Sequence, residues 1–185
     1  DPGFHIDLNT KYENLEEDEY VIIQLANDKP LNRFGSQNKV EKFIADMREI
    51  THELATKYKV VFAPHVIDDV SLSKEISSNI DNTAVLDFGK FAFDHSDKMI
   101  GYYKYARFVL AMRGHGQILP IGFNTPVIAL ENHPKHRGLM QELNLLDYNV
   151  KIDDISFANN LRKTIIDLED KRELLIEKYK IINEQ

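Results

Sequence analysis

The 185-residue sequence contains no cysteine, so it can form neither a disulfide framework nor a metal site with thiolate ligands. It also has no lysine- or arginine-rich cluster and carries a formal net charge of -7, which argues against a nucleic-acid partner. No run approaches the roughly 20 apolar residues of a transmembrane helix, and no secretion signal opens the chain. We therefore expect no transmembrane segment and a cytoplasmic location, including the inner face of the membrane.

Apolar, β-branched runs alternate along the chain with segments of helical periodicity. Runs that are apolar on both faces and are separated by helices are typical of a parallel sheet covered on both sides. The pattern predicts an α/β domain with a doubly wound parallel sheet of about six strands. The expected strands are 20–26, 59–65, 83–89, 107–113, 126–131 and 148–152, and the expected helices are 38–58, 71–80, 95–106, 116–123, 134–144 and 156–182.

The most unusual loop is Arg-Gly-His-Gly, residues 113–116, which follows the expected strand 107–113. Ligands of such sheets bind at the carboxyl ends of the strands. Arg113 offers a planar cation suited to a phosphate or carboxylate, Gly114 allows a tight turn, and His115 and Gly116 open a helix whose N-terminus attracts anions. These features predict a pocket for a small phosphorylated, acidic ligand. The alternative is that Arg113 forms a surface ion pair and His115 caps a helix, and spacing alone leaves both open.

Three residues follow the expected strand 126–131. Lys135 either neutralises a phosphate or lies exposed at the start of a helix. His133 and His136 flank it and raise the idea of a metal site. Without cysteine or a histidine pair spaced i, i+4, we expect no metal site there.

Two further loops follow strands at the same edge of the expected sheet. His65 and Asp68 follow the second strand and are candidates for the same cleft. Asn27, Lys29 and Arg33 follow the first strand, in a loop that either reaches a ligand or is solvated.

One long segment resembles the C-terminal half of the polysaccharide pyruvyl transferase family: YYKYARFVLAMRGHGQILPIGFNTPVIALENHPKHRGLMQELNLLDY. The likeness is carried by the Arg-x-His of Arg113 and His115, by Gly122 with Pro126, and by the Pro-Lys at 134–135. MQELNLLDY is similar to the family's Leu-Gly-Leu-like turn, and FAPHVIDD to its second strand and Pro-His loop. Gly114 stands where the family usually has Leu.

This resemblance implies a Rossmann-like domain that forms one half of a GT-B arrangement. Residues 1–185 would then be a single domain, the C-terminal half of a two-domain enzyme, and the start at Asp1 fits a fragment. The implied reaction transfers a pyruvyl group from phosphoenolpyruvate to a lipid-linked or polymeric sugar in exopolysaccharide or cell-surface glycan biosynthesis, with no further cofactor. Arg113 and His115 are the implied catalytic residues, with His115 as the acid. The donor-binding residues would be Arg113, Gly114, His115, Gly116, Lys135, Glu131, His65 and Asn27.

Two other functions fit the same pattern. A nucleotide-sugar-dependent glycosyltransferase or epimerase would place a diphosphate at this helix, with Glu131 on the ribose. A non-catalytic binding domain would keep the fold alone, because a fold does not settle a function.

Overall fold

The structure is a computed structural model and describes residues 12–28, 30–87 and 96–184. Six strands form one sheet in the order β3-β2-β1-β4-β5-β6, and every neighbouring pair is parallel. This is the strand order of a Rossmann-type doubly wound sheet, so the predicted fold class is confirmed. The strands are β1 (Tyr20–Gln24), β2 (Lys59–Phe62), β3 (Thr83–Val85), β4 (Val109–Ala111), β5 (Val127–Glu131) and β6 (Asn149–Lys151).

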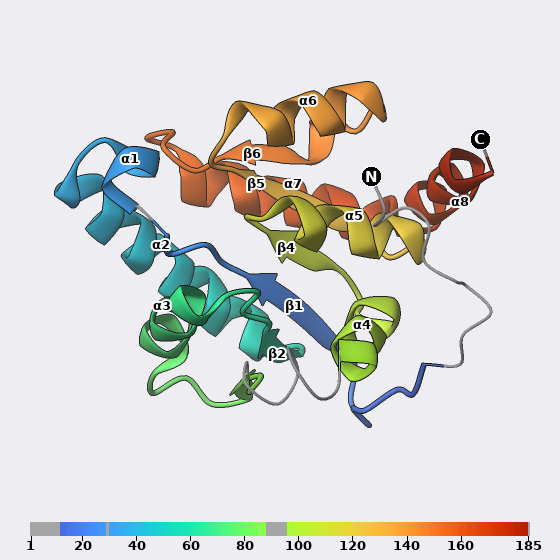
Figure 1. Ribbon diagram of the computed structural model, residues 1–185, viewed down its shortest axis with the longest axis horizontal. Helices are drawn as coiled ribbons and strands as arrows, with labels where there is room; N and C mark the ends of the chain where they lie inside the picture. Colours follow the sequence, from blue (N-terminus) through green and yellow to red (C-terminus); the bar gives the residue numbers. More distant parts are fainter. Residues whose placement is uncertain (1–11, 29, 88–95, 185) are drawn as a thin grey trace.

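The sheet lies between two sets of helices (Figure 1). On one side α2 packs against α3 and α7, and on the other α5 packs against α4 and α8. Burial on both faces explains why the central strands are continuously apolar. The helices are α1 (Pro30–Phe34), α2 (Gln37–Ala55), α3 (Ile67–Ser77), α4 (Ser96–Tyr105), α5 (Gly114–Gly122), α6 (Pro134–Glu142), α7 (Phe157–Asp170) and α8 (Arg172–Asn183), with a 3-10 turn η3 (Leu146–Tyr148).

The central strand β1 pairs with β2 on one side and with β4 on the other. Ile22 lies opposite Val61 of β2 and Val109 of β4. All five residues of β1 are buried, including the polar Gln24 at its carboxyl end. The core therefore runs through β1 and β4, and the loops that leave these two strands are anchored at its edge.

Two local features of the structure differ from the sequence-based predictions. The closing segment 156–182 forms two helices that meet at Lys171, which lets α8 turn and bury Leu175 and Tyr179. The Tyr179 hydroxyl accepts a hydrogen bond from the backbone N–H of Val127. The loop after β1 contains the short helix α1, which the sequence pattern does not indicate.

None of the described helices combines the length and the apolar character needed to cross a bilayer.

Gly114 does not make the predicted tight turn. Helix α5 begins at this residue, and Gly35 is the glycine with a positive φ in the described part of the chain. A Cβ atom added to Gly114 would meet no heavy atom within 4 Å. A glycine is therefore not required by the backbone here, although its missing side chain leaves space in front of the helix.

Candidate functional site

A cavity of about 790 Å³ opens where the loops after β1 and β4 diverge. In a sheet of this order, the helices that follow these two strands cross over in opposite directions, and ligands bind in the crevice between them. Three cationic side chains line the cavity, from α1, the β4–α5 turn and α6: Arg33, Arg113 and Lys135. Four histidines also line it: His65, His115, His133 and His136. The lining is therefore rich in groups that bind anions.

Arg113 is fixed by a buried carboxylate. Its Nε donates to Asp69 Oδ2 at 2.8 Å and its Nη2 to Asp69 Oδ1 at 2.7 Å, and Asp69 has no exposed surface. The same carboxylate accepts the backbone N–H groups of Asn27, His65 and Val66. Asp69 thus joins the loops after β1 and β2 to the arginine that follows β4. Its hydrogen bonds raise the pKa of Arg113 and keep this side chain charged.

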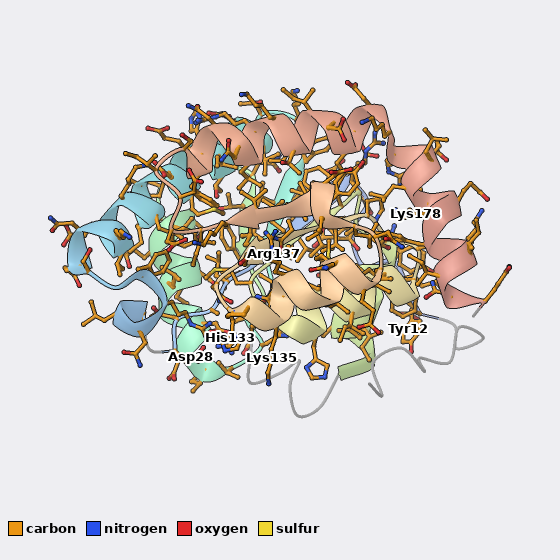
Figure 2. The ribbon with its side chains drawn as sticks, turned by 90° about the horizontal axis from the view of Figure 1, so that it is seen from above. Tyr12, Asp28, His133, Lys135, Arg137 and Lys178 are labelled. Atoms are coloured by element: carbon orange, nitrogen blue, oxygen red, sulfur yellow. The ribbon has the colours of Figure 1, made fainter. Side chains whose placement is uncertain are left out.

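Asp28 connects Arg113 to a second arginine. Its carboxylate accepts Nη2 of Arg113 and, at 2.7 Å, Nη2 of Arg33. Burial alone would raise the pKa of Asp28, but the hydrogen bond from Arg33 and the charge of Arg113 outweigh it and lower the pKa. Figure 2 shows Asp28 on the same side of the molecule as His133 and Lys135 at the start of α6, with Tyr12 and Lys178 at the other end. One carboxylate therefore holds two arginines beside the cavity.

Two helix N-termini open onto the cavity. Helix α5 starts after Arg113, whose backbone N–H donates to Gln24 Oε1 at 2.7 Å, and α6 starts after His133. The first N–H groups of a helix have no partner within the helix and attract anions. Gly116 lets α5 approach the sheet, because a Cβ atom there would lie 2.9 Å from Gln24 Oε1 and 3.2 Å from the Cβ of Ala111.

His65 is held within the protein. Its Nε2 lies 2.7 Å from the hydroxyl of Tyr103, which has no exposed surface. Burial lowers the pKa of His65 to about 4, with the charge of Asp69 opposing the shift and those of Arg113 and His115 adding to it. His65 is therefore a neutral partner of Tyr103 near pH 7.

The start of α6 brings Lys135 and two histidines to the cavity. His133 caps the helix, since its Nδ1 accepts the backbone N–H of Lys135 at 3.2 Å. This leaves Nε2 of His133 as a donor. The Lys135 side chain is exposed at the rim, whereas His136 is buried. The two histidines stand beside the candidate anion site. Among the described residues, no group of three or more His, Cys, Asp or Glu is arranged to hold a metal ion.

The predicted site residues do not all meet at the cavity. Arg113, Gly114, His115, Lys135 and His65 line it.

Three other donor-binding candidates do not line it. Gly116 is buried behind the lining. Asn27 donates to the backbone carbonyl of Asp68 and to the hydroxyl of Ser71, so it ties the β1 loop to α3. Glu131 accepts Nδ2 of Asn149 and lies 3.9 Å from Arg137, beside β6. Lys29 lies outside the described residues.

Sequence reasoning missed the groups that support the lining. Asp69 and Gln24 are buried polar residues whose partners come from distant segments, and only the topology brings them together. The adjacent acidic residues Asp68 and Asp69 are a partial signal. The sequence makes Asp68 the candidate for the cleft, whereas Asp69 is the carboxylate that binds Arg113. The sequence pattern does not indicate the apolar wall of the cavity either, which includes Met99, Ile100, Met112 and Leu119.

Comparison with known proteins gives a family. A family described as polysaccharide pyruvyl transferase matches residues 1–134 of the chain. The matched part contains Arg113, His115 and the supporting Asp69, and it ends one residue before Lys135. No curated protein matches the chain.

Proposed function

We propose, since the chain belongs to the polysaccharide pyruvyl transferase family, that its cavity binds phosphoenolpyruvate and that a pyruvyl group passes from there to a sugar. One observation carries this proposal: three cationic side chains and two helix N-termini converge on one cavity at the crevice between β1 and β4. The acceptor is a saccharide of an exopolysaccharide or cell-surface glycan, lipid-linked or polymeric. A second domain that faces this one would hold it.

Phosphoenolpyruvate carries a carboxylate and a phosphate on the same carbon atom, C2, and the cavity offers donors for both. The described contacts of the Arg113 guanidinium use Nε and Nη2, which leaves Nη1 for a ligand. Lys135 and Nε2 of His133 approach from the start of α6. The backbone N–H groups at the start of α5 supply a further anion site. These donors support a phosphate and a carboxylate bound side by side.

The transfer requires an acid and a leaving phosphate. One sugar hydroxyl oxygen bonds to C2 of phosphoenolpyruvate while the C3 methylene gains a proton and becomes a methyl group. The bond between C2 and the phosphate oxygen then breaks, and a second hydroxyl completes the ketal. The two hydroxyl protons are balanced by the methyl group and the released phosphate. We assign the proton donation at C3 to His115, because it lines the cavity beside Arg113 and imidazole is the side chain that most often serves as a general acid.

Calorimetric titration of the chain tests donor choice. We expect saturable binding of phosphoenolpyruvate and no measurable binding of nucleotide sugars. Lys135→Ala should weaken it about tenfold through the loss of one charge-assisted contact. Lys74→Ala is the matched control, since Lys74 is exposed on α3 and does not line the cavity. Binding of nucleotide sugars instead would favour a glycosyltransferase or epimerase, and binding of neither would leave a non-catalytic domain.

The assignment of His115 has its own test. In phosphate-release assays with the complete enzyme and a sugar acceptor, His115→Ala should lower kcat by about 100-fold or more and change donor affinity by a few-fold at most. A His115→Ala enzyme with normal turnover would remove His115 from the reaction.

A further inference from the structure

His136 occupies an unusual position in the cavity wall. It is the third residue of α6, with only 9% of its surface exposed. It lines both the cavity and a neighbouring hollow of about 600 Å³ between α5 and α6. Its Nδ1 is enclosed and has no hydrogen-bond partner among the described residues. Nε2 is therefore the ring nitrogen that can meet a ligand.

The charged groups around His136 are mainly cations. Arg33 approaches from α1, Arg113 from the β4–α5 turn and His133 from the start of α6. His115 and Lys135 line the same cavity.

The carboxylates nearby are engaged or lie in the neighbouring hollow. Asp28 and Asp69 already bind the two arginines, and Glu142 lines the hollow. Burial, and then the charges of His133, Arg33 and Arg113, lower the pKa of His136 to about 4. The imidazole is consequently neutral at pH 7 unless an anion offsets these cations.

An anion in the cavity changes this balance in two ways. It cancels part of the positive potential that opposes protonation, and its oxygen accepts a hydrogen bond from a protonated Nε2. We propose that His136 binds the donor's anionic group through Nε2–H and that its imidazole takes up a proton when that group binds. The identity of the donor rests on the function proposed above, whereas the coupling requires only an anion of suitable size.

Coupled protonation makes the affinity depend on pH. If the bound anion returns the pKa of His136 to its ordinary value of about 6.5, affinity for a fixed dianion rises about tenfold between pH 7.5 and pH 5.5. Binding at about pH 5.5 would then take up close to one proton, and binding above about pH 8 almost none. An imidazole with only a structural role would produce neither effect.

Sulfate is the probe, because it remains a dianion throughout this range and takes up no proton itself. Titration calorimetry at pH 5.5 in two buffers with different ionisation enthalpies measures the protons gained per sulfate. His136→Gln should bind sulfate within a few-fold of wild type at pH 7.5, since the amide N–H still donates. At pH 5.5 it should lose both the proton uptake and the roughly tenfold gain in affinity. His65→Gln and the control His52→Gln, on α2 away from the cavity, should keep both.

Each outcome decides one question. Unchanged uptake in His136→Gln, or no sulfate binding by wild type, overturns the coupling at His136. Sulfate binding with the expected uptake, combined with no binding of phosphoenolpyruvate, overturns the proposed donor and leaves the coupling intact.

A second measurement avoids substitution altogether. Ring resonances of the seven histidines in the wild-type chain can be followed against pH with and without sulfate. The midpoint of His136 should rise by at least about one unit from its starting value near 4. A midpoint that does not move overturns the proposal.

Discussion

Two arginines stand at opposite ends of the same short strand, and each is held by two carboxylates. Arg107 precedes β4 and bonds to Glu169, with Nη2 to Oε2 at 2.6 Å, and to Glu19 at 2.9 Å. Arg113 follows β4 and bonds to Asp69 and Asp28. The two ion-pair sets are alike in chemistry, and their surroundings differ.

At the amino end of β4, the carboxylates of Glu169 and Glu19 are 20% and 55% exposed, and Arg107 lines none of the cavities described above. At the carboxyl end, Asp69 is fully buried and Arg113 faces a cavity with helix N-termini and histidines. In a parallel α/β sheet, helices begin at the carboxyl ends of strands, so only that end offers unpaired N–H groups to an anion. The same kind of ion pair therefore borders a cavity at the carboxyl end of β4 and borders none of the cavities described above at the amino end.

The largest expected difference concerns stability. Asp69→Asn removes one partner of a buried pair and should lower the free energy of unfolding by about 3–5 kcal/mol. Glu169→Gln should lower it by about 1 kcal/mol, because that pair is partly exposed. Urea denaturation of both variants measures the contrast, and equal losses would mean that the two ends of β4 do not differ in this respect.

Acidification should weaken the carboxyl end selectively. The folded-state pKa values of His65 and His136 are about 4, below the ordinary 6.5. Their stabilising effect is present above about pH 6.5 and is lost as pH falls toward 4, because the unfolded chain binds protons that the folded chain does not. The free energy of unfolding should fall by about 1–3 kcal/mol per histidine over this interval.

Replacement of His65 tests whether a buried histidine causes the loss of stability in acid. Thermal denaturation across this range should show a shallower pH slope for His65→Gln, while the control His52→Gln follows wild type. Identical slopes for all three proteins would assign the acid sensitivity elsewhere.

The two arginines should also differ in how much their replacement weakens anion binding. Arg113→Gln combined with Asp69→Asn replaces the buried ion pair by two amides, so no unpaired charge is buried. This double variant should bind phosphoenolpyruvate at least about tenfold more weakly, whereas Arg107→Gln should bind within about twofold of wild type. Titration calorimetry gives both values. Comparable losses in the two variants would contradict a site at the carboxyl end.

A last comparison concerns the two glycines that flank His115. Gly116→Ala should destabilise the fold by about 1–3 kcal/mol, because the added Cβ would meet the Gln24 side chain and Ala111. Gly114→Ala should be neutral or slightly stabilising, since that Cβ meets nothing within 4 Å. Urea midpoints compare them, and a larger loss at Gly114 would reverse the interpretation.

Much of the fold could be predicted, because burial on both faces leaves a clear apolar run at each strand. The positions of Arg113 and His115 could also be predicted from the pattern, since a polar motif directly after a buried strand lies at the carboxyl edge of the sheet. The supporting carboxylates could not be predicted in the same way. Asp69 lies 44 residues from Arg113 in sequence, and their pairing exists only once the sheet has formed.

His136 illustrates a second limit of sequence reasoning. Between Lys135 and Arg137 it has the sequence context of a surface residue. Its burial depends on how α6 lies against the sheet, which periodicity over nine residues does not fix.

The strand order also has a consequence for how the chain folds during synthesis. β1, β2 and β3 are neighbours in both sequence and space, so half of the sheet can pair before residue 109 has emerged from the ribosome. Until then β1, whose five residues are all buried in the complete sheet, presents an open apolar edge that invites pairing with other chains. Translation speed through residues 86–109 should therefore influence how much of the protein is recovered without aggregation.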